Sequence, residues 1–171
     1  AISLSQTAEG AIGKVGDMLQ RMRELAVQAA NPTNGTDDRS NLDAEYQALG
    51  AEITRALTNT QFNGLKLLGA DAGSQAFQVG ANAGETITVT TTNMATNSNI
   101  TAVTGGSLTS AANATTAMTN IDTALNTVNG ERAKYGATQN RFEAVIGMLQ
   151  VSAENQAAAR SRIMDADFAQ E

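Results

Sequence analysis

The fold is decided by residues 118–163, MTNIDTALNTVNGERAKYGATQNRFEAVIGMLQVSAENQAAARSRI. In this stretch, steps of three and four residues alternate between positions that share one helical face, which predicts a heptad seam. The seam comprises Met118, Ile121, Leu125, Val128, Arg132, Tyr135, Gln139, Phe142, Ile146, Leu149, Ala153, Gln156, Arg160 and Ile163. A helix from about residue 114 to residue 165 would be a rod roughly 78 Å long.

Glycines and polar residues interrupt this seam without ending it. Gly130 and Gly136 each weaken a helix by about 1 kcal/mol relative to alanine, but the spacing continues through both. Polar side chains occupy four seam positions: Arg132, Gln139, Gln156 and Arg160. Such residues reduce the stability of a seam, and they can determine the register or number of its helices.

The N-terminal segment has the same spacing. Its apolar positions are Leu4, Ala8, Ala11, Val15, Met18, Met22, Leu25 and Ala29. A neighbouring stripe of Ile12, Leu19 and Ala26 widens the apolar face, which is typical of a bundle helix with more than one partner. We expect a helix over about residues 3–31, which Pro32 ends because proline cannot continue it.

A second helix is predicted over about residues 39–58, followed by a tight turn. The side chains of Asp37 and Asp38 can accept hydrogen bonds from the free amides of its first turn. Its apolar positions are Leu42, Tyr46, Leu49, Ile53 and Leu57. Asn63-Gly64 then marks the turn, since both residues tolerate left-handed backbone conformations.

The period changes between residues 75 and 90. Phe77 and Val79, and then Ile87 and Val89, alternate with polar residues on either side of a glycine-containing loop. This alternation predicts a β-hairpin. Residues 91–112 are rich in Thr, Asn, Ser and Gly, with few apolar anchors, and we expect a loop there.

Together these patterns predict a mainly α protein. We expect an elongated antiparallel helical bundle or coiled coil of two N-terminal helices and one long C-terminal helix, with a small β-hairpin. Residues 1–171 form a single domain in this interpretation, with parts 1–90, 91–112 and 113–171. The residues expected at the helix-packing seam include Leu4, Val15, Met18, Met22, Leu125, Val128, Phe142, Ile146 and Leu149.

Composition argues against several classes of function. The chain has no cysteine or histidine, so it lacks the commonest metal ligands and the usual general base near neutral pH. Its formal net charge of −6, with the basic residues dispersed, argues against nucleic acid as a partner. No apolar run approaches the ~20 residues needed to cross a bilayer. We therefore expect no enzyme activity, no cofactor or metal, and no membrane insertion.

The arginines of the first helix leave two interpretations open. Arg21 and Arg23 lie beside Gln20 and Glu24, at the margin of the seam. They can form a solvated face with ion pairs three residues apart, such as Arg21–Glu24. They can equally form a polar patch that docks another protein, because arginine is favoured in interface hot spots.

Several segments resemble the conserved regions of bacterial flagellins. At the N-terminal end these are AISLSQTAEGA (1–11), LQRMRELAVQ (19–28), TQFNG (60–64) and FQVGAN (77–82). At the C-terminal end they are GATQNRF (136–142), ARSRI (159–163) and DADF (165–168). They occur in the family's order over roughly residues 1–90 and 114–171.

The resemblance implies a structural protein outside the cell, in the bacterial flagellum. Flagellins are exported and polymerise into the filament, so the implied partners are other flagellin subunits, an export chaperone and the filament cap. Flagellins are also recognised by Toll-like receptor 5, an innate immune receptor. The positions that match the family's receptor-binding residues are Gln20, Arg21, Leu25 and Glu45.

Two alternatives remain beside the filament subunit. One is a flagellin-like hook–filament junction protein, which the receptor-type stretch 19–28 disfavours. The other is a surface adhesin or glycan-binding protein on a flagellin scaffold, which exposed aromatic rings would favour because sugar faces stack on them. The rings of this chain mostly occupy positions in the apolar pattern.

The ends of the sequence suggest a piece of a longer flagellin. The chain begins at Ala1 with a helical pattern already present, and the family's terminal segments and variable outer domains are absent. We therefore expect that the piece by itself makes no filament and that the first helix ends opposite about residue 140. The stripe formed by Phe142, Ile146, Leu149, Ala153 and Ile163 would then either fray or pair with a second molecule.

Overall fold

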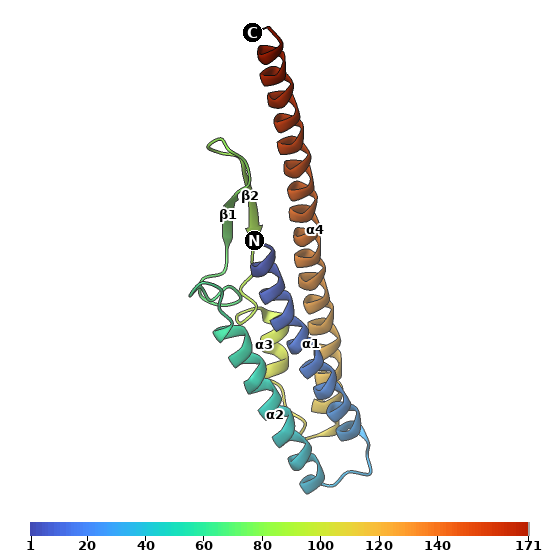
Figure 1. Ribbon diagram of the computed structural model, residues 1–171. Helices are drawn as coiled ribbons and strands as arrows, with labels where there is room; N and C mark the ends of the chain where they lie inside the picture. The colour runs from blue at the N-terminus through green and yellow to red at the C-terminus, as the bar shows by residue number, and fades with distance from the viewer. Residues whose placement is uncertain (171) are drawn as a thin grey trace.

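The computed structural model describes residues 1–170, which form four helices and one hairpin. The helices are α1 (Ile2–Ala30), α2 (Thr36–Asn59), α3 (Ser98–Thr104) and α4 (Ala111–Gln170), and the strands are β1 (Ser74–Gln78) and β2 (Thr86–Thr90). The three long helices lie side by side in an elongated bundle, and α4 continues far past the N-terminal end of α1 (Figure 1). The mainly α bundle with a hairpin that the sequence predicts is confirmed.

Helix α1 lies at the centre of the bundle because both of its apolar stripes are covered. It packs against α4 and against α2. Its buried apolar residues come from both stripes: Leu4, Ala8, Ile12, Val15, Leu19, Met22, Leu25, Ala26 and Ala29. A Cβ added at Gly16 would stand 3.5 Å from Val128 of α4, so the two backbones approach closely at that point. The prediction that this helix has more than one partner is confirmed.

The start of α2 differs from the prediction by three residues. The helix begins at Thr36, after Gly35, rather than near residue 39. The carboxylate of Asp38 lies in the first turn and accepts a hydrogen bond of 3.1 Å from the backbone N–H of Gly35. The acidic pair does serve the N-terminus, where negative charge is favourable, but from inside the helix.

The predicted tight turn at Asn63-Gly64 is confirmed. Phe62 and Leu65 exchange two backbone hydrogen bonds of 3.0 Å across it. Asn63 has a φ of 51° and Gly64 a φ of 79°. Two successive residues with positive φ are characteristic of a type I′ turn.

The predicted hairpin is also confirmed, and it packs against the side of the bundle. Strands β1 and β2 are antiparallel, with Phe77 opposite Ile87. Ile87 and Val89 are buried in a second apolar cluster with Leu4, Leu67 and Phe142. The rings of Phe77 and Phe142 meet edge to face at 5.9 Å between centroids. The hairpin therefore extends the contact surface of α4 beyond the end of α1.

The prediction of an irregular loop over 91–112 is wrong in part, because this segment contains α3. Asn97 caps the helix by accepting a hydrogen bond of 2.9 Å from the backbone N–H of Asn99. Ile100 and Val103, three residues apart, are buried in the main core. Helix α3 is stable in this place because α2 and α4 cover its apolar face.

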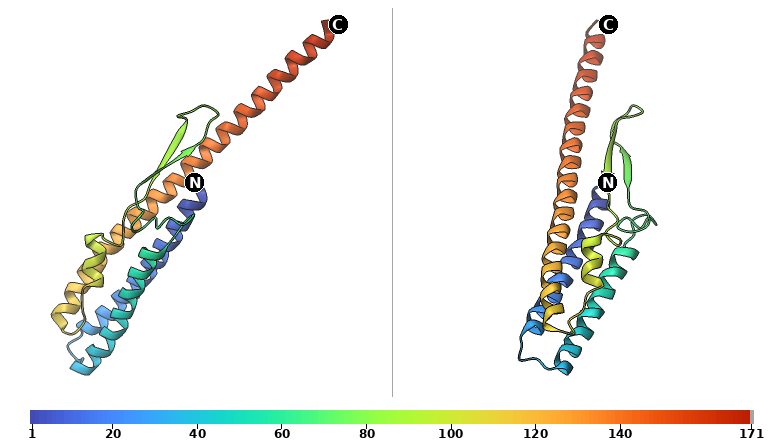
Figure 2. Two further views of the ribbon diagram at one scale, coloured as in Figure 1. Left: turned by 90° about the vertical axis from the view of Figure 1, so that its left-hand side faces the viewer. Right: turned by 180° about the vertical axis from the view of Figure 1, so that it is seen from behind.

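Helix α4 has 60 residues. The other elements cover it only as far as about two turns beyond residue 140. Phe142 is buried, whereas every residue from 148 to 170 is exposed. Ile146 and Leu149 are predicted seam residues, but they are 44% and 43% exposed and are not buried in this chain. The two further views in Figure 2 show this C-terminal part of α4 projecting free of the other elements. No helix within residues 1–170 is long and apolar enough to cross a membrane.

Candidate functional site

A polar surface is formed where α1 and α2 lie side by side near their connection. The guanidinium of Arg21 donates from Nε and Nη2 to the two carboxylate oxygens of Glu45, at 2.9 Å and 3.2 Å. Its Nη1 donates to Glu24 at 3.1 Å. The guanidinium of Arg21 is thus held by one carboxylate from each helix, Glu24 of α1 and Glu45 of α2. We call Gln20, Arg21, Glu24 and Glu45 the Arg21 patch.

The Arg21 patch is held in one geometry but is open to solvent. The hydrogen bond to Glu24, and then that to Glu45, raise the pKa of the Arg21 guanidinium above its ordinary value. The side chain remains 49% exposed. Exposed ion pairs of this kind add little to folding stability. Their main consequence is to orient a planar donor group toward the surface.

Two of the predicted receptor-binding positions differ sharply in exposure. Gln20 is exposed and lies next to Arg21 on α1. Leu25 is 1% exposed and belongs to the main core. Direct contact between Leu25 and a partner is therefore excluded in the folded bundle. Its position in the α1 seam explains the burial.

A second ion pair joins α1 to α4 on another side of α1. Arg23 donates from Nε to Asp122 at 2.7 Å, and this bond lowers the pKa of the Asp122 carboxyl. Around this pair lies a shallow open pocket lined by Gln20, Arg23, Glu24, Val27, Asp122 and Leu125. No local sequence pattern predicts this ion pair, since the two residues are 99 positions apart.

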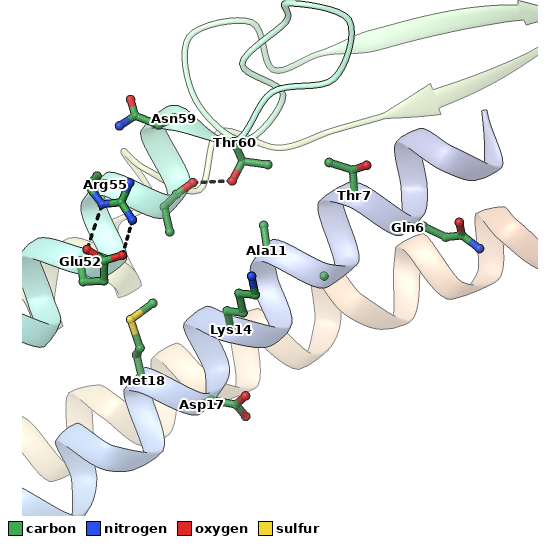
Figure 3. Close-up of a pocket in the computed structure, with 12 residues that line it drawn as sticks. Gln6, Thr7, Ala11, Lys14, Asp17, Met18, Glu52, Arg55, Asn59 and Thr60 are labelled. Atoms are coloured by element: carbon green, nitrogen blue, oxygen red, sulfur yellow. Dashed lines mark hydrogen bonds and ion pairs between the residues drawn. The ribbon is translucent and has the colours of Figure 1, made fainter.

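An open groove of about 720 Å³ runs between α1 and α2 on a further face (Figure 3). Its lining combines apolar Ala11, Met18 and Ala56 with charged Lys14, Asp17, Glu52 and Arg55. Glu52 and Arg55 form an ion pair along α2, and this hydrogen bond lowers the pKa of Glu52. The charges are spread along the rim, whereas catalytic pockets bring a few polar groups together in an enclosed space.

Two polar seam positions of α4 have a common partner that no local sequence pattern predicts. Glu9 of α1 accepts a hydrogen bond of 3.0 Å from Gln139. It also lies 3.9 Å from the guanidinium of Arg132. A Cβ at Gly13 would meet that guanidinium at 3.8 Å, so the glycine leaves room for it. Through these contacts, one turn of α1 packs against two successive turns of α4.

The predicted seam residues fall into three groups. Leu4, Val15, Met22, Val128 and Phe142 are buried, and Met18 and Leu125 are half-buried against the main core. Ile146 and Leu149 lie on the projecting part of α4. Together with Ile163, the next exposed large apolar residue at a seam position, they form what we call the α4 stripe: Ile146, Leu149 and Ile163.

Few aromatic rings are available to a ligand on the surface. Tyr46, Tyr135 and Phe142 are buried, and Phe62 and Phe77 are half-buried against the second cluster. Phe168, at 81% exposure, is the exception among residues 1–170. Sugar-binding surfaces use exposed rings, so the distribution offers the glycan-binding alternative little support.

Comparisons with known proteins agree with this architecture. The bacterial flagellin N-terminal helical region matches residues 1–72, and the bacterial flagellin C-terminal helical region matches residues 118–171. The flagellin of Halalkalibacterium halodurans is 45% identical over 170 residues, which are 99% of this chain and 62% of that protein. The flagellin of Bacillus subtilis is 37% identical, again over 99% of this chain and over 66% of that protein. The chain thus spans less than two thirds of the length of these relatives.

A solved structure matches over most of both chains. The crystal structure of Bacillus cereus flagellin superposes with a TM-score of 0.76 at 35% identity, covering 92% of this chain and 90% of that one. The matched regions include α1, α2 and nearly all of α4, which are the elements that build the bundle. This chain is a member of the bacterial flagellin family.

Proposed function

We propose that this protein is a structural subunit of the bacterial flagellar filament, located outside the cell, with other flagellin subunits as its partners. In this role it contributes to motility by assembly and catalyses no reaction. An export chaperone and the filament cap are further partners during delivery and assembly. The observation that carries the proposal is the α4 stripe, which continues the buried seam of the bundle into a segment that no other element within residues 1–170 covers.

The spacing of the α4 stripe suits a helical partner. Phe142, Ile146 and Leu149 follow one another at steps of four and three residues, as the buried seam residues do. The first of these packs against the bundle, and the other two are exposed. Burial of each large apolar side chain contributes about 1.5–3 kcal/mol, so a second chain covering several of them would be held firmly.

Cross-linking tests whether the α4 stripe joins two molecules. The chain has no cysteine, so a single introduced thiol reports on one position. We expect Leu149→Cys to form disulfide-linked dimers readily under mild oxidation. The matched control is Asn155→Cys, which is also exposed but lies on the opposite face of the helix from Ile146. Equal cross-linking at both positions, or a strictly monomeric wild-type protein at high concentration, would contradict assembly through this stripe.

We also propose that the Arg21 patch is recognised by Toll-like receptor 5. The family resemblance at Gln20, Arg21 and Glu45 motivates this, and the geometry supports it. The guanidinium is half-exposed, and two carboxylates hold it in place, so little conformational entropy is lost when a partner binds it. Leu25 serves as buried support for this surface.

A pair of arginine variants tests the receptor proposal. Arg21→Ala should weaken receptor binding by about 2 kcal/mol, as truncation of a hot-spot arginine does. Arg55→Ala is the matched control, because Arg55 is also exposed and paired with a glutamate, but on the rim of the α1–α2 groove. Circular dichroism should show the same helix content in both variants. Equal receptor affinity of the two would refute the assignment to Arg21.

A further inference from the structure

The chain contains three Asn-Gly pairs, at Asn34-Gly35, Asn63-Gly64 and Asn129-Gly130. At such a pair the backbone nitrogen of the glycine can attack the side-chain Cγ of the asparagine. Glycine favours this reaction because it has no Cβ to crowd the nitrogen and because its backbone rotates freely. The sequence alone makes the three pairs equivalent, whereas the structure places each in a different environment.

The reaction needs only water. The glycine N–H gives up its proton to solvent, its nitrogen forms a bond to Cγ, and the side-chain nitrogen takes up a proton and leaves as ammonia. The product is a five-membered succinimide. One water molecule then opens either carbonyl of the ring, giving aspartate or isoaspartate. No group is oxidised or reduced.

The helix protects Asn129-Gly130. Both residues are exposed, but they lie within α4. The helical backbone holds ψ at about −42°. It also engages the glycine N–H in a hydrogen bond to the carbonyl four residues earlier. Solvent access alone therefore does not allow the ring to close at this pair.

Hydrogen bonds protect Asn34-Gly35. The side-chain Nδ2 of Asn34 donates to the carbonyl oxygens of Gln28, at 2.6 Å, and Asn31, at 2.9 Å. The N–H of Gly35 donates to the carboxylate of Asp38 at 3.1 Å. Both reacting groups are thus engaged, and the cap of α2 would have to open before they could meet.

At Asn63-Gly64 neither constraint is present. Both residues are exposed, and within residues 1–170 neither the Asn63 side chain nor the Gly64 N–H makes a hydrogen bond. The turn is held from outside the pair, by the two bonds between Phe62 and Leu65. Of the three Asn-Gly peptide groups, the one between Asn63 and Gly64 is therefore the least restrained against rotation.

A single peptide rotation takes this turn to the geometry of ring closure. Rotation of the Asn63–Gly64 peptide converts a type I′ turn to a type II′ turn, in which ψ of the first central residue is about −120°. The φ of Asn63 is already positive, at 51°, as both turn types require. The hydrogen bonds between Phe62 and Leu65 are retained through this rotation. Since the succinimide ring holds the same torsion near this value, the turn is close to the reactive conformation.

We propose that Asn63 is a site of spontaneous deamidation in the folded protein. The reaction places an added negative charge at the turn that precedes the hairpin. The isoaspartate product also inserts a methylene group into the main chain between Phe62 and Leu65. Because Phe62 packs against the second apolar cluster, the modification loosens the contact between this turn and the base of the hairpin.

Peptide mapping of the folded protein after incubation in mildly alkaline buffer tests the proposal. Trypsin releases the three pairs in separate peptides: 24–39 for Asn34, 56–66 for Asn63 and 67–132 for Asn129. Mass spectrometry should show replacement of the amide by a carboxyl at Asn63 roughly ten-fold faster or more than at the other two, which corresponds to about 1.4 kcal/mol in the barrier. A rate at Asn63 equal to or below that at Asn34 or Asn129 would overturn the proposal.

Two controls separate the structural cause from the sequence. In guanidinium chloride the three pairs lose their environments, and their rates should converge; a persistent advantage of Asn63 in the unfolded chain would contradict the role of the turn. Asn63→Gly keeps a residue that accepts positive φ and should abolish both the mass change and the isoaspartate in peptide 56–66. Persistence of either in this variant would assign the reaction to another residue, such as Asn59.

Discussion

The hydroxyl of Tyr46 in α2 donates a hydrogen bond of 2.8 Å to the carbonyl oxygen of Val103 in α3, and both residues are fully buried. The neighbouring residues of α2 bind the segment that follows. Asp43 accepts a bond of 2.8 Å from the backbone N–H of Leu108, and Gln47 donates to the carbonyl of Gly106. Two turns of α2 thus hold the connection between α3 and α4.

Removal of the Tyr46 hydroxyl should destabilise the protein. In Tyr46→Phe the carbonyl of Val103 stays buried but loses its partner, which costs about 1–3 kcal/mol. The matched control is Tyr135→Phe, because Tyr135 is equally buried and, although Glu131 and the backbone of Thr92 lie near its hydroxyl, the hydroxyl makes no well-formed hydrogen bond within residues 1–170. Urea unfolding should show a loss for the first variant and little change, or a small gain, for the second. Equal losses would contradict the importance of the Tyr46–Val103 bond.

Alkaline pH should weaken the fold through the same residue. Burial, with a smaller effect of Asp43, raises the pKa of Tyr46 from 10.0 to about 12. Because the folded-state pKa lies above the unfolded one, the contribution is fully present below pH 10 and is lost as the pH rises toward 12. Its size is on the order of 2 kcal/mol. Tyr46→Phe should therefore lose less free energy of unfolding than the wild type over this interval, and identical pH profiles would refute the assignment.

The second apolar cluster should depend on one ring of α4. Phe142 is buried and meets Phe77 edge to face, so Phe142→Ala should cost about 3–5 kcal/mol. Ile146→Ala, four residues later on the same stripe, should cost far less in a dilute monomer, because Ile146 is already 44% exposed. Chemical denaturation of both variants provides the comparison. A similar cost for the two would show that the packed part of the helix extends further.

Two glycines of α4 should accept alanine with a gain in stability. A Cβ at Gly130 or Gly136 would meet no atom within 4 Å beyond the helix's own backbone. Alanine there reduces the entropy lost on folding and should stabilise the protein by about 0.5–1 kcal/mol at each site. Gly64→Ala is the contrasting variant, since its φ of 79° disfavours any side chain. Thermal unfolding should rank the α4 variants above the wild type and Gly64→Ala below it.

The long helices and the hairpin could be predicted because their signals are local. Heptad spacing in α1 and α4 and alternation in β1 and β2 depend only on which residues lie a few positions apart, and Pro32 and Asn63-Gly64 mark breaks by their own backbone preferences. Helix α3 was missed for the same reason. Seven residues are too few to show a period, and a helix of that length depends on the tertiary contacts that bury Ile100 and Val103.

The candidate sites depended more on tertiary structure. The sequence and its family resemblance identified Arg21 and Glu45, but the contact between them exists because α1 and α2 run side by side. The same is true of Arg23 and Asp122, and of Glu9 with Gln139. Leu25 could be assigned to the apolar seam or to a surface from sequence, and only the packing of the bundle buries it.

By itself, the sequence determined that this protein is a set of amphipathic helices with one hairpin, since the spacing of apolar residues fixes which face of each element must be covered. The tertiary structure decided where that cover ends. The apolar stripe of α4 passes from buried at Phe142 to exposed at Ile146 with no change in its spacing. The reason is geometric: α1, with 29 residues against the 60 of α4, ends near Phe142, and within residues 1–170 only the hairpin packs beside α4 beyond that point.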